Sequence, residues 1–519
     1  MSTRTRSRVY DVLPAVLPQA VPGWASMAPV DLIDPSSERQ ILELLGSADF
    51  DSWSEALDRV GNCAHPIRLR GRSETVDVAT GEIISSYASD DEPLGVTHVR
   101  CGNRRASRCP SCSRLYAADM FQLLRAGVCG GKTVPRSVAD NPLVFATLTA
   151  PSFGPVHGRR EGGPCRPGPT GHCEHGRSRS CHERHGEDDL ALGQPLCGDC
   201  YDHESHVVWQ WWAPDLWRRF TIALRRAVAK ALGVPATRVG EVATVQYAKV
   251  AEYQVRGVIH FHALVRLDGP RTPDGFAPAP AGIDAAALAL LVHQAAAAVR
   301  LTAPGVDDDD PSRVLAFGRQ LDVRAVHTGR RTDDPERGLS PEQVAGYLAK
   351  YATKSVDDST TTHNSHHRRL RAAARHLAAR ATAAEEPEGA PYGLLGKWVH
   401  TLGFRGHFAS KSRRYSVTLR ALRRARRRAQ VLIAAHRAEG RPLDLSTFEA
   451  DLLADDEAET TLVVGTWQYL GSGWSTDGER VLAVAAAARA REYAQEQAQQ
   501  RREQRNEQLR EHTQGEGNR

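Results

Sequence analysis

One apolar run of the chain carries histidines at alternate positions. Residues 257–265 read Gly-Val-Ile-His-Phe-His-Ala-Leu-Val, a length and composition that predict a buried strand. Because successive side chains of a strand point to opposite faces, His260 and His262 share one face while Phe261 and Val265 share the other. Two imidazoles on one face can bind a metal ion, although a hydrogen-bonded pair of core histidines has the same pattern.

A carboxylate near this strand could complete a metal site. Glu252 lies eight residues before His260, so the segment between them must bend or form a hairpin, for which Gly257 is suited. Two neutral imidazoles and one carboxylate would hold Mg²⁺ or Mn²⁺ and leave positions for phosphate oxygen and water. We therefore predict Glu252, His260 and His262 as metal ligands. The alternative is a surface role for Glu252, with Gln254 as the ligand in its place.

Two tyrosines follow a helix-start pattern further along the chain. The segment 340–342 combines a serine N-cap, a proline at the first helical position and an acidic first turn. In the predicted helix Tyr347 and Tyr351 are neighbours on one face. Lys350 and Lys354 each follow a tyrosine by three positions, and only seven of the 67 basic residues are lysine. The pattern predicts a catalytic face, and the alternative is an aromatic stripe packed on a core.

Together and in this order, these segments resemble the HUH endonucleases that initiate rolling-circle replication. The motif order of that superfamily is a hydrophobic strand, a His-hydrophobic-His strand and a tyrosine helix, and residues 143–151 fit the first motif. The pair Tyr347 and Tyr351 resembles the two-tyrosine class. Segments 252–262 and 402–416 resemble the replication initiators of actinomycete plasmids and integrative conjugative elements. The likeness runs from about Cys63 to about Trp474.

The resemblance implies a fold and an activity. The fold is α+β, with a ferredoxin-like antiparallel sheet and helices on one face. The activity is nicking of one strand at a plasmid origin, in which a tyrosine holds the 5′-phosphate covalently and leaves a 3′-OH primer. The metal ion would polarise the scissile phosphate, and Lys350 or Lys354 would lower the phenol pKa. Conjugative relaxases and single-strand transposases share this chemistry, and a non-catalytic zinc DNA-binding regulator is a further alternative.

Ten cysteines, including two Cys-x-x-Cys pairs, indicate zinc rather than disulfides in a cytosolic chain. We expect one or two structural Zn²⁺ ions. One site would use Cys63, Cys101, Cys109 and Cys112, and a second would use Cys197 and Cys200 with two of Cys165, Cys173 and Cys181. A single ribbon-like site that joins both pairs, or unrelated free thiols, are the alternatives. The low apolar content of residues 155–203 means that zinc must supply much of the order of this insertion.

A basic stretch follows the tyrosines. Residues 397–428 contain eleven Lys or Arg and no Asp or Glu, interleaved with aromatic residues, a mixture that can grip phosphates and stack on bases. A solvated charged helix is the alternative for residues 420–428. The candidate DNA-binding residues are Lys397, Arg405, Lys411, Arg413, Arg414 and Tyr415.

At 519 residues the chain is long enough for about three domains. We expect an irregular and helical segment at 1–60, a zinc module at 61–140, the endonuclease domain at 141–360, the basic region at 361–475 and a charged helical or disordered tail at 476–519. Within these we expect helices at 38–45, 114–126, 216–232 and 285–300, and strands at 239–250 and 321–326.

The sequence shows no pattern of a membrane span or of an ATPase. Prolines break the apolar stretch of residues 1–24, and no run approaches the ~18 apolar residues of a membrane span, so we expect a cytoplasmic protein without a membrane partner. Residues 127–133 resemble a phosphate-binding loop, but the glycine spacing is one residue short. The expected partners are single-stranded DNA, origin DNA and, because the chain shows no ATPase motif, a host helicase that unwinds the origin.

Overall fold

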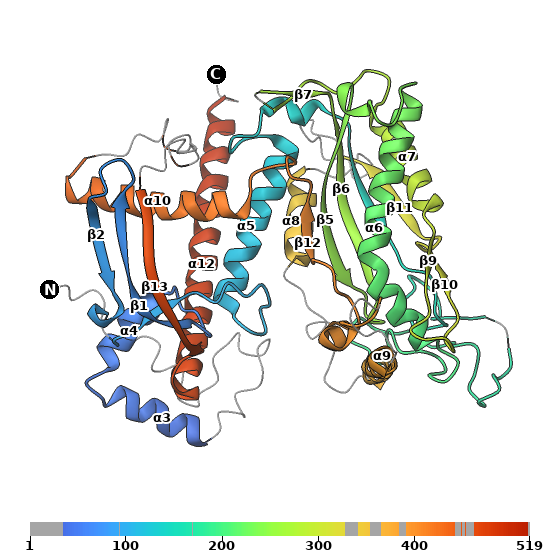
Figure 1. Ribbon diagram of the computed structural model, residues 1–519, viewed down its shortest axis with the longest axis horizontal. Helices are drawn as coiled ribbons and strands as arrows, with labels where there is room; N and C mark the ends of the chain where they lie inside the picture. The colour runs from blue at the N-terminus through green and yellow to red at the C-terminus, as the bar shows by residue number, and fades with distance from the viewer. Residues whose placement is uncertain are drawn as a thin grey trace. The chain divides into compact units, whose positions relative to one another are not determined.

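The computed structural model describes residues 35–516 apart from 93, 169, 274, 327–340, 353–364, 384–390, 442–447, 449–451 and 453–460. It is an α+β protein with antiparallel sheets, as predicted. The chain divides into two compact units (Figure 1). Unit 1 takes its described residues from Met1–Tyr116 and Asp455–Arg519, and unit 2 takes its own from Ala117–Ala454. Among the described helices, none is both long and apolar enough to cross a membrane.

Unit 1 joins the two ends of the chain in one sheet. Strand β1 pairs antiparallel with β13 from Ile67 opposite Ser472 to Asp77 opposite Thr461, and it also pairs with β2 and β3. Trp474, just after β13, packs against Trp53 and donates its indole N–H to the Cys63 carbonyl at 2.9 Å. The elements are α3 (Pro35–Leu45), α4 (Phe50–Arg59), β1 (Ile67–Asp77), β2 (Ile83–Ala88), β3 (Thr97–Val99), the start of α5 (Pro110–Cys129), β13 (Thr461–Ser472) and α12 (Asp477–Glu516).

This pairing differs from the domains expected from sequence. Residues 461–472 were expected to continue the basic region, but they form a strand of the N-terminal unit. The tail beyond residue 476 forms α12, which packs against α3. Strand pairing between segments almost 400 residues apart leaves no local pattern in the sequence, since each strand shows only its own composition.

Unit 2 is built on a five-stranded antiparallel sheet in the order β11-β4-β6-β5-β12. The strand that carries the two histidines, β6, is therefore central. The strands are β4 (Leu143–Leu148), β5 (Thr244–Tyr253), β6 (Ile259–Asp268), β11 (Leu321–Ala325) and β12 (Ala409–Lys411). The strand expected at 239–250 begins later, because Val239–Glu241 forms a short 3-10 helix.

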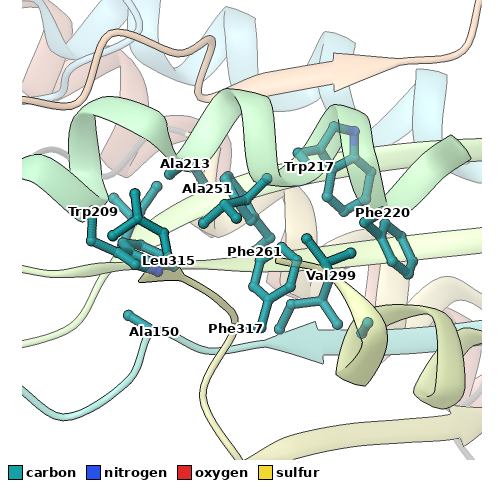
Figure 2. Packing of buried hydrophobic residues seen from close by; sticks show 14 of the residues in the cluster. Ala150, Trp209, Ala213, Trp217, Phe220, Ala251, Phe261, Val299, Leu315 and Phe317 are labelled. Carbon is teal, nitrogen blue, oxygen red and sulfur yellow. The ribbon is translucent and has the colours of Figure 1, made fainter. Parts of the chain in front are cut away.

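Helices α6 (His203–Ala231) and α7 (Ala285–Ala298) cover one face of this sheet. Helix α6 starts at Asp202, whose carboxylate accepts the Ser205 N–H at 2.9 Å and caps the helix. Trp217 and Phe220 of this helix lie over Phe261 of β6, as Figure 2 shows. The odd-numbered residues of β6 thus form the core face, as the alternation predicts.

The opposite face of the sheet is also covered by a helix, which corrects the expectation of helices on one face. Helix α8 (Pro341–Tyr351) brings the rings of Tyr347 and Tyr351 against His262, an even-numbered residue of β6. Figure 1 shows α8 on the side of the sheet away from α6 and α7. The remaining elements of unit 2 are β7 (Arg271–Thr272), β8 (Gly275–Phe276), β9 (Leu301–Ala303), β10 (Arg313–Leu315), α9 (Ser365–Ala383), α10 (Leu419–Ala438) and the 3-10 helices Arg136–Asp140 and Leu395–Thr401.

Strands β5 and β6 form a hairpin, as predicted from the spacing of Glu252 and His260. Gly257 N–H donates to the Gln254 carbonyl, and Gln254 N–H donates to the Val258 carbonyl, both at 2.8 Å. Gly257 has φ +80°, a left-handed conformation that glycine adopts without strain. The turn sets the strand register so that Glu252 lies directly opposite His260.

Replacing Gly257 with alanine should destabilise unit 2. A Cβ there costs about 1–2 kcal/mol in the left-handed conformation, and it would lie 2.9 Å from Nε2 of His367. We expect Gly257→Ala to lower the melting temperature of this unit by roughly 2–8 °C. Gly240→Ala is the matched control, because a Cβ there meets nothing within 4 Å and the φ is not positive. If calorimetry gives Gly257→Ala the same melting temperature as Gly240→Ala, the role of the turn is contradicted.

Candidate active site

Three ligand atoms converge on the even-numbered face of β6. Oε2 of Glu252 lies 3.1 Å from Nε2 of His260 and 3.0 Å from Nε2 of His262, and the two imidazole nitrogens are 3.1 Å apart. The carboxylate comes from β5 and both imidazoles come from β6, so the antiparallel register alone brings them together. The structure thus unites the three residues that the sequence predicts as metal ligands.

The separations of these atoms fit a six-coordinate ion. Ligands at 2.0–2.1 Å from an octahedral ion are about 3.0 Å apart when adjacent, whereas the same bonds in a tetrahedral site give about 3.4 Å. The observed 3.0–3.1 Å between all three pairs matches adjacent octahedral positions on one triangular face. The residues present therefore fit Mg²⁺ or Mn²⁺.

The charge of Glu252 suits this role. Burial by itself would raise the pKa of its carboxyl group, but hydrogen bonds from His260 and His262 outweigh burial and lower the pKa to about 2. The carboxylate is therefore ionised at neutral pH. The rival ligand Gln254 is engaged elsewhere, since its Oε1 accepts the Nε–H of Arg256 at 2.9 Å.

Strand β4 supports the site from the other side of β6. Thr147 lies opposite His262, and its hydroxyl is 3.1 Å from Nδ1 of that imidazole. A hydrogen bond at Nδ1 fixes the ring and leaves Nε2 for the metal. The ring of Phe145 stacks on His262 with centroids 5.7 Å apart. Thr147 was not predicted as a site residue, although a polar side chain within an apolar strand indicates such a role.

Both tyrosines of α8 reach the same imidazole. Ring centroids lie 5.3 Å apart for Tyr347 and His262, 5.8 Å for Tyr351 and His262, and 4.4 Å for the two tyrosines. The side chain of Tyr347 is 40% exposed, so it remains accessible. The helix begins at Pro341 as the sequence predicts. The structure therefore places two phenols beside one candidate metal site.

The surroundings of Tyr347 change the pKa of its phenol. Burial, a hydrogen bond with Tyr351 and the charge of Glu252 raise the pKa of Tyr347 above its ordinary value. Lys350 is exposed on this helix, and Lys354 lies outside the described residues. That either lysine lowers the pKa of a phenol stays a prediction. The Tyr347 phenol is protonated at neutral pH, because its pKa is raised.

The candidate DNA-binding residues separate into two sets. Tyr415 is fully buried, with its ring against Gly127 and 5.3 Å from the guanidinium of Arg266, so it cannot stack on a base. Arg405 pairs with Asp215 at 2.5 Å. Lys411 donates to the carbonyls of Arg413 and Ser416, and burial lowers its pKa to about 8. Three of the predicted residues are exposed: Lys397, Arg413 and Arg414.

The described cysteines and histidines form three groups that could hold metal ions. The first contains Cys63, Cys101, Cys109 and Cys112, the set that the sequence predicts. The sulfur of Cys63 lies 3.8 Å from that of Cys109 and 3.6 Å from that of Cys112. Four thiolates at ~2.3 Å around a tetrahedral zinc ion are about 3.8 Å apart. These residues therefore fit structural zinc.

The other two groups correct the predicted pairing. One contains Cys173, His175, Cys197 and Cys200, and the other contains His157, Cys165, Cys181 and His185. Two of Cys165, Cys173 and Cys181 were expected to join Cys197 and Cys200, but only Cys173 does so, and His175 is the fourth member. The histidines were not predicted as ligands. The two Cys-x-x-Cys pairs lie in separate groups. Cys129 belongs to none of the three groups found in the described part of the chain.

Comparisons with known proteins agree with the resemblance to replication initiators. A family model described as RepSA, replication initiator protein, pSAM2, matches residues 49–488. A replication initiator protein from Streptomyces ambofaciens is 39% identical over 475 residues, which cover 88% of this chain and 94% of the relative. No solved structure matches the chain.

Removing the charge of Glu252 should weaken the binding of divalent ions. Loss of even an outer partner of a ligand costs 10–100-fold in metal affinity, so we expect Glu252→Gln to lower Mn²⁺ affinity by at least ~10-fold in calorimetric titration. The control is Glu241→Gln, which removes an exposed carboxylate that pairs with Arg238. Equal Mn²⁺ affinity in the two variants would rule out Glu252 as a ligand.

The first cysteine group should contribute a tightly bound zinc ion. We expect Cys112→Ser to lower the zinc content of purified protein by one ion per chain and to make unit 1 unfold at lower temperature, because metal binding and folding are coupled. Cys129→Ser is the control, since Cys129 lies in none of the groups. Elemental analysis that finds the same zinc content in Cys112→Ser and wild type would contradict this assignment.

Proposed function

The chain belongs to the RepSA family of replication initiators, and we propose that it starts plasmid replication by nicking one strand at the origin through metal-dependent tyrosine transesterification. The observation that carries the proposal is the convergence of Glu252, His260 and His262 with two tyrosine rings within 6 Å of the His262 ring. A core pair of histidines would need neither the carboxylate nor the phenols. The central His-x-His strand and the tyrosine helix support an HUH endonuclease fold.

The proposed reaction exchanges one phosphate ester for another. The phenolic oxygen of a tyrosine attacks the scissile phosphorus and the bond to the 3′ oxygen breaks, so the 5′-phosphate becomes a phosphotyrosyl ester. The phenol gives up its proton as the new bond forms, and the leaving oxygen takes up a proton to become the 3′-OH primer. A divalent ion held by the triad would polarise the phosphate during this exchange. The ester keeps the energy of the broken bond, so the reverse reaction can rejoin the strand.

Exposed basic residues would bind the phosphates of the DNA strand. Lys350 is exposed on the helix that carries both tyrosines and could contact the scissile phosphate. Lys397, Arg413 and Arg414 are exposed in the basic region, and α10 adds exposed Arg423 and Arg427 while Leu422 faces the interior. Phosphate contacts of this kind bind DNA without reading its sequence. Unwinding of the origin would be left to a host helicase.

Substitution of the two tyrosines should divide the activity between them. Both phenols lie beside His262, so we expect Tyr347→Phe and Tyr351→Phe each to retain part of the cleavage of an origin oligonucleotide and the double variant to retain none. The covalent 5′-adduct is measured by mass spectrometry, and Tyr351 is the expected first nucleophile. His260→Ala is the control that should abolish cleavage while DNA affinity stays within a few-fold of wild type.

Three outcomes would change the proposal. Loss of all adduct in one single variant, with no change in nicking or rejoining by the other, would make this a one-tyrosine enzyme. DNA binding without Mn²⁺-dependent cleavage in wild type would identify a zinc-dependent DNA-binding regulator instead. Cleavage by His260→Ala at the wild-type rate in a metal titration would remove the triad from the mechanism.

A further inference from the structure

A Cys/His group whose two histidines were not predicted as ligands lies in the insertion at residues 155–203 of unit 2. We propose that His157, Cys165, Cys181 and His185 bind a Zn²⁺ ion whose function is to brace the turn of the β5–β6 hairpin. The proposal concerns folding and positioning, so it does not depend on the nicking activity. It has three parts: the ligands, the carboxylate behind one of them, and the connection from the site to the turn.

The four ligand atoms lie close enough together to bind one zinc ion. Nδ1 of His157 lies 3.1 Å from Nε2 of His185 and 3.9 Å from the sulfur of Cys165. The sulfur of Cys181 lies 3.5 Å from Nε2 of His185. Ligands at the usual Zn–N and Zn–S lengths are about 3.3–3.8 Å apart in a tetrahedron. Three of these residues are buried, with only His157 partly exposed, and the set is the Cys₂His₂ combination of structural zinc sites.

A carboxylate orients one ligand from outside the group. Nδ1 of His185 donates to Oδ2 of Asp189 at 2.6 Å, which directs Nε2 of the same ring toward the other ligands. Histidines that bind zinc commonly donate their second N–H to a carboxylate in this way. The backbone N–H of Gly158 also donates to the sulfur of Cys165 at 3.2 Å, a contact that stabilises a thiolate. Both contacts indicate a metal site rather than a chance gathering of side chains.

The site is connected to the catalytic hairpin through residues 189–194. Asp189 also accepts the N–H of Ala191, so the same carboxylate shapes the start of this loop. At the end of this loop, the backbone N–H of His157 donates to the Gln194 carbonyl at 2.8 Å. The His157 carbonyl accepts the Gly193 N–H at 2.9 Å. A zinc ligand thus holds the loop by two backbone hydrogen bonds.

Gly193 packs directly against the backbone of the hairpin turn. With φ +76° it approaches so closely that a Cβ would lie 2.6 Å from the carbonyl carbon of Val255. Helix α9 holds the same turn from another side, since Nε2 of His367 lies 3.2 Å from the Val255 carbonyl and Nε2 of His366 lies 3.0 Å from the Arg256 carbonyl. Gln194 links the two supports, because its side chain accepts the N–H of His366 at 3.3 Å. Loss of zinc would therefore loosen one of the two supports of the turn.

The test compares Asp189→Asn with Asp188→Asn, a neighbouring exposed aspartate for which the same charge is lost. We expect a chelator to remove zinc from Asp189→Asn at 10–100-fold lower chelator concentration than from wild type, and Asp188→Asn to behave as wild type. Cys181→Ser should lower the zinc content by one ion per chain. If Cys181→Ser does not fold, the chelator comparison on Asp189→Asn decides the question on soluble protein.

Hydrogen exchange tests the brace. After chelation of Asp189→Asn, peptides covering residues 252–260 should exchange faster than in the zinc-loaded protein, while peptides covering β11 should not change. Equal zinc content in wild type and folded Cys181→Ser, or equal chelator sensitivity of the two aspartate variants, would overturn the metal site. Unchanged exchange at the turn after zinc loss would overturn the brace. Neither measurement requires DNA cleavage, so a failure here is distinct from a failure of the proposed nicking.

Discussion

The register of the β5–β6 hairpin is the constraint on which the candidate active site depends. Glu252 and His260 are cross-strand partners, and His262 follows on the same face. A slip of one residue would turn every side chain of one strand to the opposite face and separate the carboxylate from the imidazoles. Gly257 in the turn, the Gly193 contact and the two histidines of α9 all oppose such a slip. The contacts that hold this turn therefore also keep the three residues of the site together.

One face of β6 packs in the hydrophobic core, and the other face carries the residues of the candidate site. Phe261 and its odd-numbered neighbours pack under α6, and burial of one aromatic side chain of this kind stabilises a fold by about 2–3 kcal/mol. The other face carries His260, which contacts Glu252, and His262, which contacts the tyrosines of α8. Helices on both faces are therefore a requirement of the site: one set holds the central strand, and α8 delivers the phenols to it.

Local patterns predicted the parts of the site that arise from one or two neighbouring elements. Alternation placed His260 and His262 on one face, and their distance from Glu252 implied the hairpin. The same reasoning failed where distant segments decide the environment. Tyr415 lies in a basic, aromatic stretch typical of DNA-binding regions, yet the missing side chain of Gly127 leaves room for its ring in the interior. His157, His175 and His185 join cysteines in an insertion with little apolar content, where no strand or helix period limits which ligands can meet.

The pairing of β1 with β13 has a consequence for the order of synthesis. Residues 67–77 leave the ribosome long before residues 461–472 exist, and at about 5–20 residues per second the interval is roughly 20–80 s. During that time all of unit 2 can emerge and fold. Strand β1 still lacks β13, the strand that pairs with it over its full length. Unit 1 is thus completed after unit 2, and a nascent chain released before residue 461 would carry a folded unit 2 and an incomplete sheet in unit 1. The fold of unit 1 closes only once β13 and the helix α12, which packs on α3, have been made.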